Sequence, residues 1–172
     1  PVIAYFSMEV GLESTIPTYA GGLGVLAGDT LRAAADLGVP LVGISLVHRQ
    51  GYLQQRLDEQ GRQQEAPAPW SPEERLEETS ARITVSIEGR PVAVRAWRHA
   101  IRGTAGFEVP VYLLDANLPE NAPEDRALTD RLYGGDRRHR LCQEVVLGIG
   151  GVAVLEALGY DDVRAYHMNC LL

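Results

Sequence analysis

The sequence of 172 residues contains no lysine, and all 16 of its basic residues are arginines. A chain without lysine cannot supply a Schiff-base amine, the lysine of a phosphate-binding P-loop or a catalytic lysine amine. Any reaction that needs lysine must therefore take that residue from elsewhere.

Cysteine is also scarce, since only Cys142 and Cys170 are present and they form no C-x-x-C pair. This pattern predicts neither a disulfide scaffold nor a metal site, and we expect two reduced thiols in a cytoplasmic protein. No apolar run approaches the ~20 residues that span a bilayer, and no signal peptide opens the sequence. Because a strand-like run follows Pro1 at once, we expect the sequence to begin inside a longer chain.

The balance of charge is acidic, with 16 basic against 23 acidic side chains and a formal net charge of −7. This balance argues against binding to a nucleic-acid backbone, although a local basic pocket is compatible with it. The chain is 45% hydrophobic and long enough to bury a sizeable core. We therefore expect a folded domain that binds neither nucleic acid nor membrane.

Hydrophobic periodicity predicts a strand, a helix and a second strand at the start of the chain. Residues 2–8 form a short apolar run, and leucines and alanines recur at helical spacing over 23–35, before Gly38. Residues 41–47 form the second apolar run. This order is typical of a βαβ unit with parallel strands, so we expect an α/β fold.

The middle of the chain, residues 48–118, differs from the flanking segments in composition and hydrophobic pattern. It predicts a β-rich insertion in the α/β domain. Residues 52–57 could form a strand, whereas 60–80 are polar and rich in proline and glutamate, as in a surface excursion. Alternating apolar residues over 83–96 then predict an antiparallel β-hairpin with one solvated face.

One further strand is predicted at 107–114, and Pro110 within it indicates an edge strand or an irregularity. Residues 137–158 predict a long helix that contains three glycines, Gly148, Gly150 and Gly151. Each is a poor helix former, so we expect close backbone packing there, against the sheet or a partner. Residues 163–168 predict a third parallel strand.

The segment Gly22-Leu23-Gly24-Val25-Leu26-Ala27 fits the dinucleotide pattern G-x-G-x-x-G/A. Dinucleotide binding is disfavoured, because about a dozen residues separate these glycines from the first strand and no acid closes the second strand. Two interpretations are open. Backbone N–H groups at the start of the helix could hold an anion or a sugar oxygen, or the glycines could form a tight turn that packs against the sheet.

Three polar residues follow predicted strands or end them. Glu9 follows the first strand, His48 the second, and His167 lies at the end of the third. Ligands bind at this edge of an open α/β sheet, so we expect these side chains to converge beside the glycine segment. His99 and His139 lie elsewhere, and we expect no catalytic role for them.

A series of short blocks carries a resemblance to a known family. The blocks, in chain order, are Tyr5-Phe6-Ser7-Met8-Glu9, Gly11-Leu12, Tyr19-Ala20-Gly21-Gly22-Leu23-Gly24-Val25-Leu26-Ala27-Gly28-Asp29, Arg49-Gln50-Gly51-Tyr52, Tyr133-Gly134-Gly135-Asp136, Gln143-Glu144-Val145-Val146-Leu147-Gly148-Ile149-Gly150-Gly151 and His167-Met168-Asn169. Together they resemble the N-terminal part of bacterial or archaeal α-glucan phosphorylases, the glycogen and maltodextrin phosphorylases.

This resemblance implies a GT-B architecture, in which the active site lies between two Rossmann-like domains. It implies phosphorolysis of terminal α-1,4-linked glucose to glucose 1-phosphate by a homo-oligomeric enzyme. It also implies pyridoxal phosphate on a lysine of the C-terminal domain. It places five residues at the substrate and phosphate, namely Glu9, Gly21, Gly22, Leu23 and Gly24. It gives catalytic roles to His167 and Asn169.

The sequence departs from the family at its end, where Cys170-Leu171-Leu172 replaces the Glu-Gly-His that follows Asn169 in the family motif. We therefore expect residues 1–172 to be a single incomplete N-terminal domain, inactive alone, without the cofactor-binding domain. Two alternatives are open. A glycogen or starch synthase also carries such a glycine loop, but typically with a lysine where Tyr19-Ala20 stands here. A non-catalytic glucan-binding module is the other.

Overall fold

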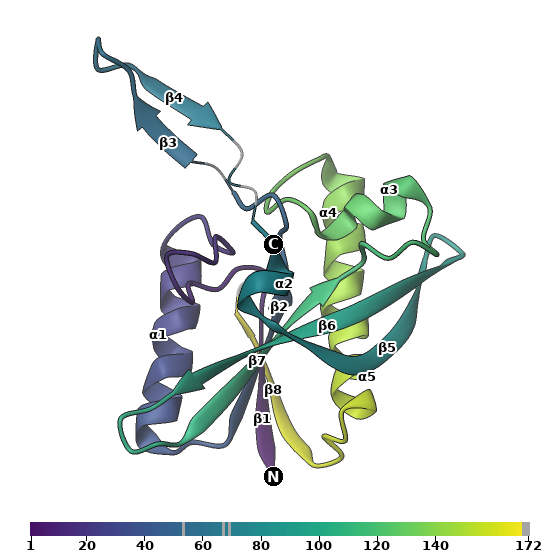
Figure 1. Ribbon diagram of the computed structural model, residues 1–172. Helices are drawn as coiled ribbons and strands as arrows, with labels where there is room; N and C mark the ends of the chain where they lie inside the picture. Colours follow the sequence, from purple (N-terminus) through teal and green to yellow (C-terminus); the bar gives the residue numbers. More distant parts are fainter. Residues whose placement is uncertain (53, 67, 69, 170–172) are drawn as a thin grey trace.

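The computed structural model describes residues 1–169 apart from positions 53, 67 and 69. The chain forms an α/β fold around a six-stranded sheet of strand order β5-β6-β7-β2-β1-β8. Helix α1 (Gly22–Leu37) covers one face of this sheet, and the helices α4 (Arg137–Val145) and α5 (Gly151–Ala157) cover the other (Figure 1). No helix in the described part of the chain is long and apolar enough to cross a membrane.

Four neighbouring strands are parallel, and the predicted βαβ unit is confirmed. Strand β1 (Val2–Ser7), helix α1 (Gly22–Leu37) and strand β2 (Leu41–Leu46) follow one another, and β1 pairs with β2 in parallel. Strand β8 (Val163–Asn169) adds to the other side of β1, as predicted. Gly38 ends α1 in the left-handed conformation, at φ 66°, where glycine is favoured.

Strands β5 (Glu77–Ile87) and β6 (Arg90–Arg102) form the predicted antiparallel hairpin, which is longer than its sequence signal. Strand β7 (Glu108–Asp115) joins this hairpin to the parallel strands, since it pairs with both β6 and β2. The β-rich region thus extends the central sheet and does not form a layer of its own.

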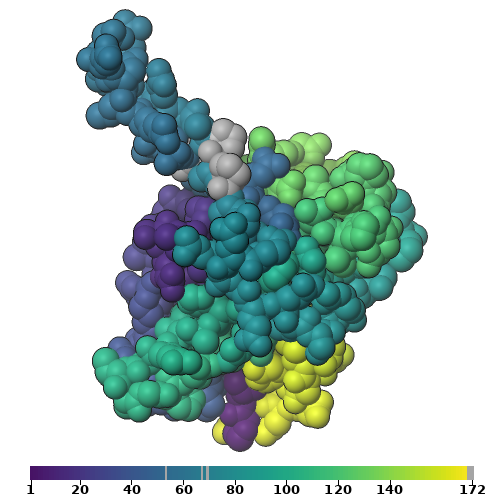
Figure 2. Space-filling model, in the orientation of Figure 1, coloured from purple at the N-terminus to yellow at the C-terminus, as the bar shows by residue number. Residues whose placement is uncertain are grey.

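Strands β3 (Gln54–Leu57) and β4 (Gln63–Ala66) stand apart from this sheet, as a two-stranded ribbon. Every residue of these two strands is exposed, and the ribbon projects from the body of the molecule (Figure 2). The range 60–80, predicted as a surface excursion, includes β4, the short helix α2 (Pro72–Arg75) and the start of β5.

Pro110 predicts an edge strand or an irregularity, and of these two alternatives the edge strand is wrong, because β7 lies inside the sheet. The register explains why proline fits there. Pro110 pairs with Ala100 of β6, but the pairing of β7 with β2 begins only at Val111. At Pro110 the strand therefore has a neighbour on one side only, and the missing N–H removes no hydrogen bond to β2.

A helical rod follows the short helix α3 (Pro123–Arg126) and a 3-10 turn at Ala127–Thr129. It comprises α4 (Arg137–Val145), a π-helical segment at Val146–Gly150 and α5 (Gly151–Ala157). The expected close packing is confirmed at Gly151, where a Cβ would lie 2.5 Å from the Phe6 ring. At Gly148 a Cβ would meet nothing within 4 Å in this chain, so Gly148 does not pack against the sheet.

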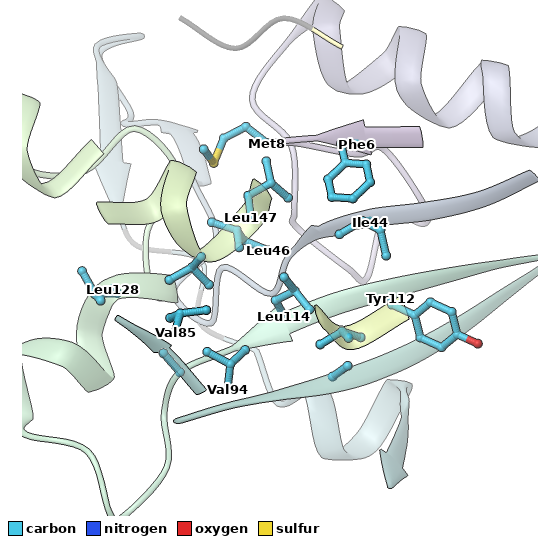
Figure 3. Packing of buried hydrophobic residues seen from close by; sticks show 14 of the residues in the cluster. Phe6, Met8, Ile44, Leu46, Val85, Val94, Tyr112, Leu114, Leu128 and Leu147 are labelled. Atoms are coloured by element: carbon cyan, nitrogen blue, oxygen red, sulfur yellow. The ribbon is translucent and has the colours of Figure 1, made fainter. Parts of the chain in front are cut away.

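Two hydrophobic clusters fix the sheet between its helices. Phe6, Met8, Ile44, Leu114 and Leu147 belong to the cluster under the α4–α5 rod (Figure 3). The other cluster joins alternate residues of the same strands to α1. Because β7, β2, β1 and β8 are parallel, their carboxyl ends lie at one edge of the sheet, where α1 also begins.

Candidate functional site

Glu9 lies at that edge, directly behind the start of helix α1. Its Oε2 atom accepts the N–H of Ala20 at 2.7 Å and the N–H of Gly21 at 3.2 Å. Glu9 itself is buried, and its carbonyl accepts the Ser7 hydroxyl at 2.6 Å. The carboxylate therefore fixes the backbone that leads into the glycine segment.

The other carboxylate oxygen of Glu9 accepts a hydrogen bond from the Tyr133 hydroxyl at 2.5 Å. Tyr133 belongs to the loop before α4 and has a positive φ of 55°, and the Arg140 guanidinium lies 4.9 Å from its ring centroid. An open cavity of about 460 Å³ adjoins this loop and is lined by Tyr133, Gly134, Arg137 and Arg140 among others. The sequence motifs include Tyr133 without indicating that it contacts Glu9.

The glycines of the segment have two different roles. A Cβ on Gly24 would lie 2.3 Å from the Tyr19 Cβ and 2.8 Å from the Glu9 carboxylate. A Cβ on Gly28 would lie 2.1 Å from the Gly11 carbonyl oxygen. These two glycines are thus needed for packing. Gly21 and Gly22 are exposed, and a Cβ on either would meet nothing within 4 Å.

Gly21 is the N-cap of α1, a helix of 16 residues without a side-chain cap or an acidic residue in its first turn. The first N–H groups of a helix have no acceptor within it, and the helix dipole makes this end positive. Glu9 takes the N–H groups just before the helix. The first turn, from Gly22 to Gly24, is thus able to hold an anion or a sugar oxygen.

Asn169 joins the end of β8 to this turn. Its Nδ2 atom donates to the Leu23 carbonyl and to the Ser7 hydroxyl, both at 3.3 Å. Asn169 is 8% exposed. It therefore holds the backbone of the first turn of α1 in place.

His167 lies two residues earlier in β8 and stacks on Tyr5, with ring centroids 4.8 Å apart. A cavity of about 390 Å³ between α1 and β8 is lined by Leu26, Thr30, His167 and Asn169 among others. His167 therefore lies on the α1 face of the sheet, beside the first turns of α1.

His48 lies at the same sheet edge as Glu9, but inside the protein. It is fully buried, and its Nε2 atom donates to the Met8 carbonyl at 2.8 Å. Burial lowers the pKa of His48 to about 4, against the opposing effects of that hydrogen bond and of Glu9. His48 is thus a neutral donor behind Glu9, and the expected convergence applies to the edge and not to one open surface.

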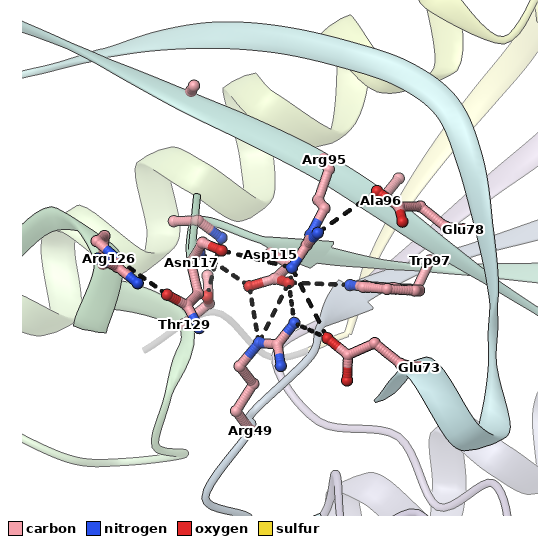
Figure 4. A network of polar contacts seen from close by, with 12 residues as sticks. Arg49, Glu73, Glu78, Arg95, Ala96, Trp97, Asp115, Asn117, Arg126 and Thr129 are labelled. Carbon is pink, nitrogen blue, oxygen red and sulfur yellow. Dashed lines mark hydrogen bonds and ion pairs between the residues drawn. The ribbon is translucent and has the colours of Figure 1, made fainter. Parts of the chain in front are cut away.

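A buried polar network follows β2 and β7 at this edge (Figure 4). Asp115 is fully buried and accepts hydrogen bonds from Arg49 Nη2 at 2.7 Å, Arg95 Nε at 2.9 Å and Trp97 Nε1 at 2.9 Å. Burial alone would raise the pKa of Asp115, but the hydrogen bonds from Arg49 and Trp97 hold that pKa below its usual value. No sequence motif indicates this network.

The remaining two histidines contact other residues. His99 lies in β6, where its Nε2 is 3.8 Å from a Glu13 carboxylate oxygen, and the His139 N–H is capped by Asp136 in the first turn of α4. In the described part of the chain, no group of three or more histidine, cysteine, aspartate or glutamate residues could hold a metal ion.

Comparison with known proteins agrees with the motif resemblance. No protein-family model matches the chain. The chain is 40% identical over 176 residues to maltodextrin phosphorylase of Thermococcus litoralis, 43% over 180 residues to glycogen phosphorylase of Mycobacterium tuberculosis, and 38% over 173 residues to glycogen phosphorylase of Aquifex aeolicus.

These matches cover 98%, 97% and 97% of this chain, but only 20%, 20% and 24% of the respective relatives. The chain thus spans between a fifth and a quarter of their length. The predicted resemblance to glycogen and maltodextrin phosphorylases is confirmed, and the chain is similar to a fragment of such an enzyme.

Proposed function

We propose that the chain forms the N-terminal domain of an α-glucan phosphorylase, which uses phosphate to release glucose 1-phosphate from α-1,4-glucans. Identity of 38–43% to three phosphorylases over nearly the whole chain supports this assignment. The observation that carries it is the first turn of α1, where Gly21 and Gly22 leave the backbone open to a ligand.

Phosphorolysis breaks the C1–O bond of the terminal glucose and forms a C1–O bond to phosphate. The enzyme must therefore hold an anion beside the sugar. Backbone N–H groups at a helix start can do this without a lysine, and this chain has none. Because Glu9 already binds the N–H groups of Ala20 and Gly21, we assign the groups of Gly22, Leu23 and Gly24 to the ligand.

The other residues at this edge have supporting roles in the proposal. Glu9 orients the turn from behind, and Asn169 holds the Leu23 carbonyl from β8. His167 lines the α1–β8 cavity, and we assign it to a sugar hydroxyl of the substrate. The cavity beside Tyr133 provides further space for the glucan.

The implied cofactor does not fit this chain, because pyridoxal phosphate requires a lysine amine and the sequence has none. In the proposed architecture the cofactor lysine belongs to a second Rossmann-like domain of a GT-B enzyme, outside these residues. We further propose a cytoplasmic homo-oligomer with α-1,4-glucan and phosphate as substrates. To that enzyme this chain contributes substrate contacts and the positioning of the glycine turn.

The direct test is an assay of the longer protein that contains this chain, with maltoheptaose and inorganic phosphate. We expect glucose 1-phosphate to form only when both are present. Transfer of glucose from a nucleotide sugar, without phosphorolysis, would instead support the synthase alternative. Glucan binding without either reaction would support a non-catalytic module.

A further inference from the structure

His48 combines three properties that are unfavourable by themselves. It is fully buried, its φ of 43° lies in the left-handed region, and its Nδ1 atom has no hydrogen-bond partner within the described structure. A left-handed conformation in a residue other than glycine costs about 1–3 kcal/mol, and a buried polar atom without a partner adds to that. An apolar side chain would avoid the second cost.

The Nε2–H group accounts for the presence of histidine at this position. The Met8 carbonyl can only accept, so the bond at 2.8 Å requires a proton on Nε2. The pKa of about 4 keeps the imidazole neutral at ordinary pH, and Nδ1 is then a lone-pair acceptor. His48 thus supplies one N–H donor to the end of strand β1.

Surrounding contacts hold His48 in its strained conformation. Its carbonyl accepts the Gly51 N–H at 2.7 Å and the Trp70 Nε1–H at 2.9 Å. The next residue, Arg49, is fixed by Asp115. Several contacts thus hold the turn after β2 in one conformation. This is expected where a strained backbone must direct a side chain, here His48, towards a single acceptor, the Met8 carbonyl oxygen.

The Met8 carbonyl oxygen is adjacent in the chain to Glu9, a residue of the candidate site. The Met8 carbonyl belongs to the peptide group that joins Met8 to Glu9, and the Glu9 carboxylate holds Ala20, Gly21 and Tyr133. We propose that His48 is a positioning residue, which fixes the Met8–Glu9 peptide and thereby aims the Glu9 carboxylate at the glycine turn. Its effect on catalysis rests on the phosphorylase function proposed above.

Substitution of His48 with glutamine or asparagine distinguishes two reasons for histidine at this position, namely its Nε2–H donor and its positive φ. Glutamine can place its Nε2–H close to the position of the histidine Nε2–H. Asparagine tolerates a positive φ better, but it is too short to reach the Met8 carbonyl. His48→Gln should therefore preserve the Glu9 geometry, and His48→Asn should lose it. His99→Gln is the matched control, because His99 lies away from Glu9.

The first measurement is amide hydrogen exchange of Ala20 and Gly21 in the chain itself. We expect about tenfold faster exchange at both amides in His48→Asn, the effect of losing one buried hydrogen bond. His48→Gln and His99→Gln should exchange as the unchanged chain does. Equal protection in the Gln and Asn variants, with both folded, would overturn the proposal. Faster exchange of Ala20 and Gly21 in both His48→Gln and His48→Asn would also overturn the proposal.

The second measurement uses the same variants in the longer protein, with phosphorolysis as the readout. We expect His48→Asn to lower kcat at least tenfold with little change in the KM for glucan, and His48→Gln to restore kcat. An active unchanged enzyme with an equally active Asn variant would overturn the positioning role. An inactive unchanged enzyme would instead reject the proposed function, and hydrogen exchange would still decide the role of His48.

Discussion

The Tyr133 hydroxyl and the Glu9 carboxylate form a hydrogen bond across 124 positions of sequence. It joins the loop after β1 to the loop before α4, which lie on opposite sides of the sheet edge. Since the other oxygen of Glu9 binds the entry to α1, one carboxylate fixes the start of one helix and the loop that leads into another. Both loops border the surface proposed to bind substrate.

Replacing Tyr133 with phenylalanine tests this link. Tyr133→Phe removes the hydroxyl and keeps the ring beside Arg140, so we expect the fold to survive with a loss of about 1 kcal/mol in the free energy of unfolding. Urea denaturation measures this loss. Tyr166→Phe is the control, because Tyr166 is a half-exposed residue of β8, and it should leave the midpoint unchanged. An unchanged midpoint for Tyr133→Phe would show that the bond adds no stability.

The buried network around Asp115 predicts a much larger effect. Asp115→Asn would leave the guanidinium groups of Arg49 and Arg95, both largely buried, without their buried counter-charge. Removing one partner of a buried ion pair typically costs about 3–5 kcal/mol, so we expect a loss of that size in urea denaturation. Asp29→Asn, which breaks an exposed pair with Arg32, is the control and should have little effect. Similar midpoints for the two variants would contradict a stabilising role for the network.

The pKa of His48 predicts a specific dependence of stability on pH. His48 titrates near 6.5 in the unfolded chain and at about 4 in the folded chain. Between these values the unfolded state binds more protons, so stability falls as the pH is lowered from about 6.5 towards 4. The contribution amounts to about 3 kcal/mol by the conversion of 1.36 kcal/mol per pKa unit.

The measurement compares unfolding free energies of the unchanged chain and His48→Gln over pH 7 to 4. The pKa of His99 is also lowered by burial, but His99 is present in both proteins and cancels in the difference. Burial and Arg140 oppose protonation of His48, whereas Glu9 favours it. Parallel pH curves for the two proteins would mean that His48 is protonated as readily in the folded state as in the unfolded one.

The parts of the fold that follow from local pattern could be predicted from the sequence. Periodicity over 23–35 and the stop at Gly38 give α1, and the apolar runs give the parallel strands. Pro110 wrongly suggests that β7 is an edge strand. Whether β7 lies at the edge depends on its pairing with β2, which is far away in sequence. Asp115 escapes prediction because a carboxylate at a strand end has no local signal for the arginines that surround it.

The candidate site divides in the same way. Gly22 and Gly24 are alike in sequence, and only their neighbours in space show that one is open and the other is packed against Tyr19. The placement of Glu9 at the sheet edge follows from strand order, but its bond to Tyr133 depends on how α4 packs. The sequence predicts that His48 lies at this edge. It does not predict that the side chain points into the protein, because that direction depends on the turn that follows β2.

The open position of Gly22 makes it the sharpest test of the substrate site. A Cβ at Gly22 would meet no side chain or distant backbone atom of this chain within 4 Å, so we expect the loss of activity in Gly22→Val to come from the ligand side. Backbone donors aimed at developing charge contribute about 2.7–4 kcal/mol. We therefore expect turnover in the longer protein to fall at least a hundredfold, with an ordinary cooperative melting curve.

Gly148→Val is the matched control, because Gly148 is also a helical glycine whose Cβ would meet nothing within 4 Å. Both variants replace a helical glycine with valine, which has a slightly better helix propensity, so both should change stability by similar, small amounts. Steady-state kinetics of both, with melting curves, separates the alternatives. Near-normal turnover in Gly22→Val would reject the assignment of this turn to the substrate. A melting temperature that drops far below that of Gly148→Val would show instead that the turn serves packing, as Gly24 does.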